Sequence, residues 1–217
     1  MESPSWLHCH SELAALRLSV VLPGSGDRVA RLGRAQRIGY DQPLREGAVA
    51  GQTVRLVTVE RIAGRELWVQ PATFRDLWPL ARLQRRCFEP RHAYSALALL
   101  VLWVWPGVRL LVARVGDELV GCIVGDQRNG HARVLNLCVR PDWRRRGVGS
   151  VLLAALEREC DAELYTLMVE DKNAPARALY RRFGYVPVAE IRHYYGRNRH
   201  GVLMQKRRGE RPSWPCT

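Results

Sequence analysis

Lysine is nearly absent from this chain, and no two cysteines are spaced as a metal-binding pair. Of the 34 basic residues among 217, only Lys172 and Lys206 are lysines, and the net charge at pH 7 is +13. The six cysteines include no C-x-x-C pair, which argues against a zinc site and against a disulfide framework. We therefore predict a cytoplasmic protein without a metal, and the basic charge favours anionic ligands or partners.

The sequence also lacks an apolar run long enough to cross a bilayer. Residues 93–108 carry no charge, but these 16 residues fall short of the roughly 20 that a transmembrane helix needs. We expect no transmembrane segment and no signal peptide. A buried helix is the expected structure of this run. A membrane-surface contact or a dimer contact is the alternative, because the helix is apolar on nearly all sides.

The remaining composition is that of a globular protein. Hydrophobic residues make up 47% of the chain, and its length fits one main domain. We divide the chain into an N-terminal extension of unknown role (1–65), a main domain (66–207) and a C-terminal tail (208–217). The extension is rich in glycine and contains strand-like fragments, such as residues 54–59.

Apolar periodicity in the main domain predicts the element order β-α-α-β-β-β-α-β-α-β-β. The expected fold class is therefore α+β, arranged in α/β layers: a mixed central β-sheet is flanked by helices. A capping-box signal at Thr73-x-x-Asp76 predicts the start of the first helix, and Gly116-Asp117 predicts a hairpin. The expected strands cover residues 67–69, 109–115, 119–124, 132–139, 164–169, 186–195 and 202–205.

The stretch from Arg140 to Ser150 is the first candidate binding site. An apolar strand enters it, a helical pattern beginning at Val148 leaves it, and Gly147 and Gly149 lie between them. Free backbone N–H groups at such a helix start, together with the helix dipole and nearby arginines, favour a phosphate-bearing ligand. A dinucleotide loop requires G-x-G-x-x-G, and a nucleoside-triphosphate loop requires Gly-Lys-Ser/Thr; both are absent. The ligand that still fits the loop is a pyrophosphate bound without a metal.

A second motif adds a family resemblance. The run from Asn173 to Tyr180, followed by Phe183-Gly184-Tyr185, resembles the N-x-x-A-x-x-L-Y-x-x-x-G-F/Y pattern of the GNAT N-acetyltransferase superfamily. The V-x-P-x-x-R-x-x-G-x-G run at 139–149 resembles the acetyl-CoA loop of that superfamily. Both motifs occur in the order and separation typical of the family, and the resemblance covers residues 66–206. It implies a GNAT-like acyl-CoA acyltransferase fold.

Within the superfamily the chain most resembles ribosomal-protein alanine N-acetyltransferases. The segment 135–139 is similar to their acetyl-CoA strand, and 191–195 is similar to their R-x-x-Y-Y segment. Residues 197–201 depart from the pattern, because basic residues stand where acidic residues are expected. The resemblance implies transfer of an acetyl group from acetyl-CoA to a primary amine by direct attack on the thioester. A protein N-terminal α-amino group, as on a ribosomal protein, is the expected acceptor.

The resemblance also implies how acetyl-CoA is held. Backbone groups of Leu137 and Val139 would pair with the pantetheine arm, and Asn173 would donate a hydrogen bond to it. Asn173 is also a candidate helix N-cap, and the two roles are compatible. Main-chain amides in the loop would hold the pyrophosphate, and arginine side chains there add charge-assisted contacts. The loop residues assigned to this task are Arg144, Arg145, Arg146, Gly147, Val148, Gly149 and Ser150.

Two residues are the expected catalytic groups. Tyr180 matches the general acid of the family, which protonates the departing CoA thiolate. The glutamate that alanine N-acetyltransferases use as a base is replaced here by Met168. We therefore expect Glu170, on the same side of the strand, to act as the base through a water molecule; a solvated charge at the end of the strand is the alternative. His131 and His193 are the alternatives, and an α-amino group with a pKa near 8 needs little help from a base.

Three other interpretations stay open at this point. The acceptor could be a lysine side chain or a small-molecule amine. The chain could instead be a CoA-binding module with little catalysis, because the glutamate of the family is missing. The arginines could also contact RNA, although charge is the only support for such a contact and no RNA-binding motif is present.

Overall fold

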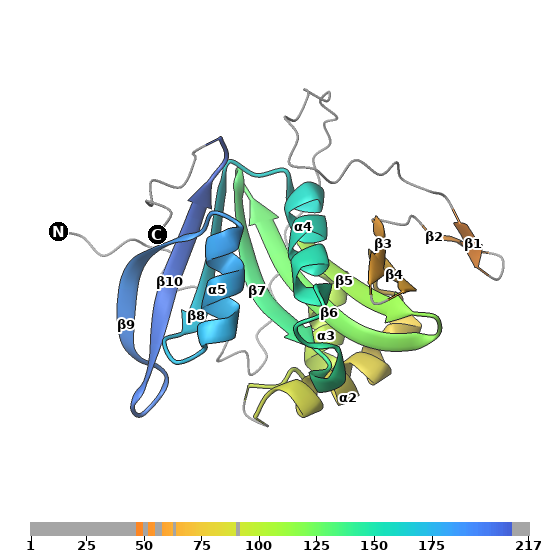
Figure 1. Cartoon of the computed structure of the whole chain (residues 1–217), viewed down its shortest axis with the longest axis horizontal. Coiled ribbons are helices and arrows are strands. Elements are labelled where there is room, and N and C mark those ends of the chain that lie inside the picture. The colour runs from red at the N-terminus through yellow and green to blue at the C-terminus, as the bar shows by residue number, and fades with distance from the viewer. Residues whose placement is uncertain (1–46, 50–51, 55–57, 63, 90–91, 210–217) are drawn as a thin grey trace. The chain divides into compact units, whose positions relative to one another are not determined.

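One mixed β-sheet organises the fold. The computed structural model describes residues 47–49, 52–54, 58–62, 64–89 and 92–209, and eight strands within these ranges form the sheet β3-β4-β5-β6-β7-β8-β10-β9 (Figure 1). The pair β7 and β8 is parallel, and the other neighbours are antiparallel. The strands are β3 (Thr58–Ile62), β4 (Arg65–Pro71), β5 (Val108–Val115), β6 (Glu118–Arg128), β7 (His131–Val139), β8 (Leu164–Glu170), β9 (Val186–Gly196) and β10 (Arg199–Arg207). The strands β1 (Gly47–Val49) and β2 (Gln52–Val54) pair separately.

The helices begin where the sequence carries caps. Asp76 accepts hydrogen bonds from both the amide and the hydroxyl of Thr73, at 2.7 and 2.8 Å, which completes the predicted capping box. Ser95 caps the second long helix by accepting from the amide of Ala98 at 3.1 Å. The helical elements are η1 (Phe74–Asp76), α2 (Leu77–Cys87), α3 (Ala96–Val104), η2 (Pro141–Trp143), α4 (Val148–Cys160) and α5 (Ala174–Arg182).

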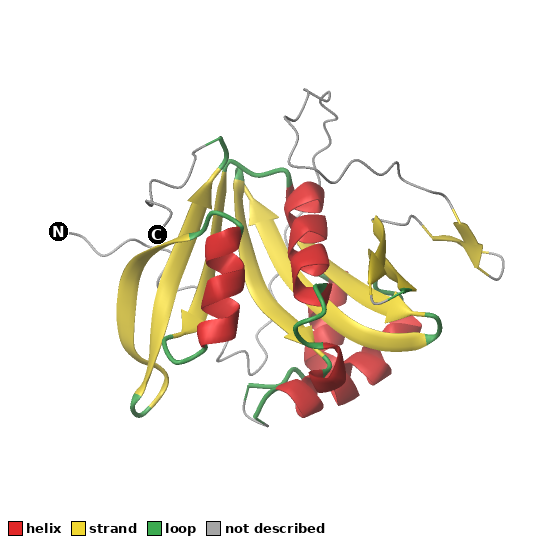
Figure 2. Ribbon diagram, in the orientation of Figure 1, coloured by secondary structure: helices red, strands yellow, loops and turns green. Residues whose placement is uncertain are grey.

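Helices cover both faces of the sheet, and each face has its own core. On one face α4 and α5 pack on the sheet, and they cross in front of it in Figure 2. On the other face α2 and α3 pack on the sheet. Strand alternation explains the two cores, because Leu111 and Ala113 of β5 face α4 while Leu110 and Val112 face α2 and α3. The predicted fold class and element order are thus confirmed.

The sheet extends to Thr58, N-terminal to the predicted domain boundary. β3 pairs with β4 in register from Thr58–Val69 to Ile62–Arg65. The sheet thus includes residues that the predicted division assigns to the extension. The division at residue 65 itself stays a prediction. The strand-like fragment at 54–59 falls partly on β2 and β3. Residues 1–46 and 210–217, which include most of the extension and of the tail, lie outside the described residues.

The expectation of a buried helix at 93–108 is wrong for most of that helix. The helix is shorter, Ala96–Val104, and Leu99 is the one residue of α3 that is fully buried. Leu97 and Val104 are 63% and 62% exposed, so an apolar face points away from the core. The described helices include none that is long and apolar enough to cross a membrane.

Candidate active site

β7 and β8 separate from each other in the middle of the sheet. Their parallel pairing runs from His131–Leu164 to Val134–Leu167 and ends there. Beyond this point β7 follows β6 up to Val139, whereas β8 follows β10. Within the described residues, the backbone of 135–139 therefore has no pairing with β8. An extended ligand can add to such an edge as an extra strand.

The loop after β7 presents free donors where α4 begins. Gly147 caps the helix in the left-handed region, with φ of 91°, a conformation that glycine adopts without a steric penalty. Among the described residues, the amides of Val148 and Gly149 have no backbone acceptor. The amide of Ser150 differs, because it donates to the carbonyl of Gly147 at 2.9 Å. The helix start thus offers an anion two amides and the positive end of a dipole.

Close packing holds this helix start beside β7 and α5. A methyl group added at Gly149 would lie 3.4 Å from the Leu179 side chain on α5 and 3.8 Å from the Val139 side chain. These are ordinary van der Waals distances, so the start of α4 lies directly against both α5 and β7 at Gly149. The loop, the free edge of β7 and the helix that carries Tyr180 are brought together by this contact.

The predicted arginines of the loop have different surroundings. The Arg144 Nε donates to the carbonyl oxygen of Val139 at 3.2 Å, so this side chain ties the loop to β7. Arg145 is exposed and has φ of 59°. The Arg146 guanidinium lies 5.2 Å from the ring centre of the buried Trp143. Arg140, in contrast, is paired with Asp142 at 2.7 Å.

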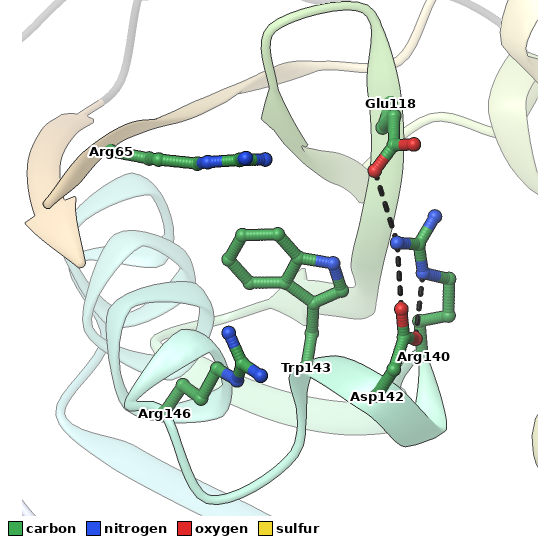
Figure 3. Close-up of a pocket in the computed structure, with 6 residues that line it drawn as sticks. All are labelled: Arg65, Glu118, Arg140, Asp142, Trp143 and Arg146. Carbon is green, nitrogen blue, oxygen red and sulfur yellow. Dashed lines mark hydrogen bonds and ion pairs between the residues drawn. The ribbon is translucent and has the colours of Figure 1, made fainter. Parts of the chain in front are cut away.

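A pocket of about 300 Å³ lies next to the loop (Figure 3). Arg65 and Arg146 reach toward its Trp143 ring, while Arg140 pairs with Glu118 and Asp142 at one side. Neither Arg65 nor Arg146 forms an ion pair with a carboxylate in the ranges that the structure describes, and both place positive charge beside the phosphate-type loop, where Arg146 also acts on Asp142. Sequence reasoning did not identify Arg65, because it comes from β4, far along the chain.

Asn173 and Tyr180 lie at the two ends of α5. The Asn173 side-chain oxygen accepts from the amide of Ala176 at 3.2 Å, so Asn173 is a helix cap and its side-chain NH₂ group is left for other contacts. Tyr180 is buried, with its ring 5.8 Å from that of Tyr185. Burial raises the pKa of Tyr180 well above its usual value, which keeps its hydroxyl protonated at neutral pH.

Glu170, at the end of β8, is fully engaged in ion pairs. Arg199 donates to its two carboxylate oxygens at 2.6 and 2.9 Å, and this contact lowers the pKa of Glu170. Arg199 also contacts Glu89 at 3.0 Å, and Glu89 lies 3.9 Å from His92. A carboxylate held in this way is a weak base. The arrangement favours a role for Glu170 as an anchor for Arg199 over its predicted role as a general base.

Tyr195 is a site residue without an assigned role in the sequence analysis. Its hydroxyl donates to the carbonyl oxygen of Met168 at 3.0 Å, across β10. Its ring packs against those of Tyr194 and His92. Burial raises the pKa of Tyr195, and Tyr180 is near enough to raise it further. The R-x-x-Y-Y segment was the sequence signal for this tyrosine.

The two alternative bases lie elsewhere. His131 stands at the first residue of β7, at the opposite end of the strand from Val139, and its Nε2 lies 2.8 Å from the Thr166 hydroxyl. Burial lowers the pKa of His131. His193 is in the β9–β10 hairpin, where its ring nitrogen accepts from the amide of Asn198 at 3.1 Å. The described residues also contain no cluster suited to a metal ion.

Comparisons with known proteins find acetyltransferases among the similar sequences and structures. The profile of the Acetyltransferase (GNAT) family matches residues 77–185. An uncharacterised N-acetyltransferase of Methanocaldococcus jannaschii is 27% identical over 138 residues, which span 62% of this chain and 87% of that protein. A Bacillus subtilis protein provisionally named a ribosomal-protein-bS18 alanine N-acetyltransferase is 33% identical over 76 residues, or 34% of this chain and half of that protein. The ribosomal-protein-S18 alanine N-acetyltransferase of Escherichia coli superposes with a TM-score of 0.60 at 19% identity, covering 70% of this chain and 99% of that structure.

Proposed function

The chain belongs to the Acetyltransferase (GNAT) family and is an acetyl-CoA-dependent N-acetyltransferase, and we propose that its acceptor is the α-amino group of a protein N-terminus. N-terminal alanine, as on a ribosomal protein, is the acceptor proposed in particular. The support comes from the resemblance of 135–139 and 191–195 to alanine N-acetyltransferases. A relative named for that activity is 33% identical over the matched segment.

The ion pair between Glu170 and Arg199 is the observation that carries this proposal. Both carboxylate oxygens of Glu170 accept from Arg199, and Met168 occupies the position of the family glutamate. Glu170 is therefore not free to accept a proton. An α-amino group has a pKa near 8, so about a tenth is already neutral at pH 7, whereas a lysine amine near 10.4 is almost fully protonated. A site with only a weak base is therefore better matched to an α-amino group than to a lysine side chain.

The residues at the loop fit the pyrophosphate of acetyl-CoA. The amides of Val148 and Gly149 have no acceptor among the described residues and lie at the positive end of α4. We assign them the pyrophosphate, with exposed Arg145 and Arg146 adding positive charge. The amide of Ser150 already donates to the carbonyl of Gly147. We therefore assign the predicted contact of Ser150 with the pyrophosphate to its side-chain hydroxyl. Asn173 keeps its NH₂ group for the pantetheine arm.

The free edge of β7 would orient the thioester. Backbone groups of Leu137 and Val139 are assigned to the pantetheine, as the family resemblance implies. The carbonyl of Val139 already accepts from Arg144, so its contribution to the ligand would come from its N–H group. A backbone N–H aimed at the thioester oxygen would stabilise the negative charge that develops there when the amine attacks, an effect of about 3 kcal/mol in other enzymes.

Tyr180 completes the proposed reaction as the general acid. The neutral amine attacks the thioester carbon, the carbon–sulfur bond breaks, and the Tyr180 hydroxyl gives its proton to the leaving thiolate. Burial keeps that proton in place until sulfur carries negative charge. The released proton of the amine passes to water, and the phenolate recovers a proton from solvent. No acyl-enzyme intermediate forms, so sequential kinetics are expected.

The test uses labelled acetyl-CoA and two matched peptides. One peptide has a free N-terminal alanine and no lysine, and the other has a blocked N-terminus and one lysine. Polyamines serve as the small-amine comparison, and mass spectrometry identifies the acetylated nitrogen. Label on the alanine α-nitrogen alone supports the proposal. Label on lysine or polyamine with none on alanine overturns it, and acetyl-CoA binding without turnover on any acceptor overturns it in favour of a CoA-binding module.

A further inference from the structure

Three cysteines lie near one another behind the strand assigned to acetyl-CoA. Cys87 is the last residue of α2 and is half-buried, with its sulfur 3.4 Å from the carbonyl oxygen of Val139. Cys138 on β7 and Cys122 on β6 face each other in register, are both buried, and have sulfurs 3.3 Å apart. Cys138 directly precedes Val139, and its thiol is close enough to Cys87 to lower the pKa of that residue. Cys138 therefore contacts Cys122 on one side and lies near Cys87 on the other.

The three positions differ in exposure and in charge. Cys87 is the member of the cluster that solvent reaches, and Arg144 lies beside it. The hydrogen bond from Cys138, together with that arginine, lowers the pKa of Cys87 to about 7. Burial and the neighbouring sulfurs hold Cys138 as a thiol by raising its pKa. Because the thiolate is the reactive form of cysteine, the cluster combines one accessible nucleophile with one protonated thiol close to it.

We infer that Cys87 is a modification site for peroxides and soft electrophiles, and that Cys138 is the thiol that resolves its oxidised form. The Cys87 thiolate attacks one oxygen of a peroxide, the O–O bond breaks, and sulfenic acid and hydroxide form. The Cys138 sulfur then attacks the sulfur of Cys87, an S–S bond forms, and the Cys87 oxygen leaves with the Cys138 proton as water. The two sulfurs together lose two electrons, and the peroxide is reduced.

The position of Cys138 connects this chemistry to the cofactor. Cys138 lies between Leu137 and Val139, so a disulfide to α2 would move the backbone edge assigned to pantetheine. This coupling rests on the proposed function, whereas the modification site itself does not. We expect the oxidised protein to bind acetyl-CoA at least about fivefold more weakly than the reduced protein. An oxidised protein that carries the disulfide and binds acetyl-CoA unchanged would overturn the coupling.

Oxidation can be assigned to individual cysteines by mass spectrometry, because trypsin places each of four cysteines in its own peptide. Cys87, Cys122, Cys138 and Cys160 fall in peptides 87–91, 115–128, 134–144 and 159–172. After treatment of the full chain with hydrogen peroxide, we expect peptides 87–91 and 134–144 joined by a disulfide, 2 Da lighter than their summed mass (the loss of two hydrogens). A disulfide between 115–128 and 134–144 with Cys87 unmodified would overturn the assignment.

Cys160 is the matched control. It is buried on α4, and burial raises the pKa of its thiol to about 11. Cys160→Ser should form the same disulfide, and Cys87→Ser should form none. A second measurement does not depend on the folding of any variant. Iodoacetamide labelling of the unmodified protein should rise with a midpoint near pH 7 in peptide 87–91, and equal rates for Cys87 and Cys160 at pH 7 would contradict the inference.

Discussion

Arg199 holds both carboxylate oxygens of Glu170, through its Nε and one terminal nitrogen at 2.6 and 2.9 Å. The contact joins the first residue of β10 to the last residue of β8. A further bond from Arg199 to Glu89 carries the connection to the segment after α2. The ion pair neutralises the carboxylate of Glu170 at the end of β8, beside the place assigned to the acceptor amine. It therefore bears on both the mechanism and the stability of the site.

Replacing Glu170 should cost little activity if it anchors Arg199. We expect Glu170→Gln to keep kcat within about threefold and to leave the shape of the pH–rate profile unchanged. In both proteins, kcat/KM for an alanine peptide should rise with pH and level off near the amine pKa of about 8. Glu89→Gln, which removes the negative charge that Arg199 and His92 share outside Glu170, is the matched control. A large loss of kcat with a displaced acid limb, confined to Glu170→Gln, would identify Glu170 as the base after all.

The same ion pair predicts how stability depends on pH. The folded-state pKa of Glu170 lies below the unfolded value of about 4.3 because Arg199 binds the charged form. The ion pair therefore contributes its full stabilisation of the folded protein above the unfolded-state pKa. This contribution is lost as the pH falls through the folded-state pKa. Because both partners are mostly buried, Glu170→Gln should lower the free energy of unfolding by about 1 kcal/mol at pH 7. Urea titrations should find this difference shrinking below about pH 4, and a difference that grows toward acid pH would contradict the argument.

Tyr180→Phe tests the general acid. We expect kcat to fall at least about tenfold, because the thiolate loses its proton donor, while the dissociation constant for acetyl-CoA changes by less than about twofold. Tyr185→Phe is a suitable control, since Tyr185 is equally buried and its ring packs against that of Tyr180. Steady-state kinetics and calorimetry separate the two effects. Normal turnover in folded Tyr180→Phe would exclude the role.

Gly147→Ala tests the loop. The substitution places a methyl group on a residue with φ of 91°, which should lower the free energy of unfolding by about 1 kcal/mol. Because the amides of Val148 and Gly149 follow directly, we also expect KM for acetyl-CoA to rise about tenfold or more. Gly130→Ala offers the same kind of backbone cost, with φ of 74° and open space around it, in the turn between β6 and β7. An equal effect of both variants on KM would mean that the loop does not bind the cofactor.

Local signals explain which parts of this protein could be predicted. The Thr73 capping box, the Gly147 turn and the Asn173 cap each act within a few residues, so their positions were readable and the structure places them where expected. Apolar periodicity likewise indicated every strand from β4 to β10. The family followed from two motifs with the right separation. The expected burial of α3 failed because its composition is apolar on all sides and carries no signal for which side meets the sheet.

The order of the strands in the sheet could not be predicted from the apolar periodicity of the sequence. β10 pairs between β8 and β9, and this placement sets Arg199 against Glu170, 29 residues away in the chain. The packing of α2 on β7 likewise sets Cys87 against Val139, 52 residues away. The residue pattern accounts for the element types, the phosphate-type loop and the acetyltransferase family, because each depends on contacts between near neighbours in the chain. The weakened base and the thiol cluster arise from segments that meet only once the sheet has assembled, and their chemistry follows from burial and charge at those meeting points.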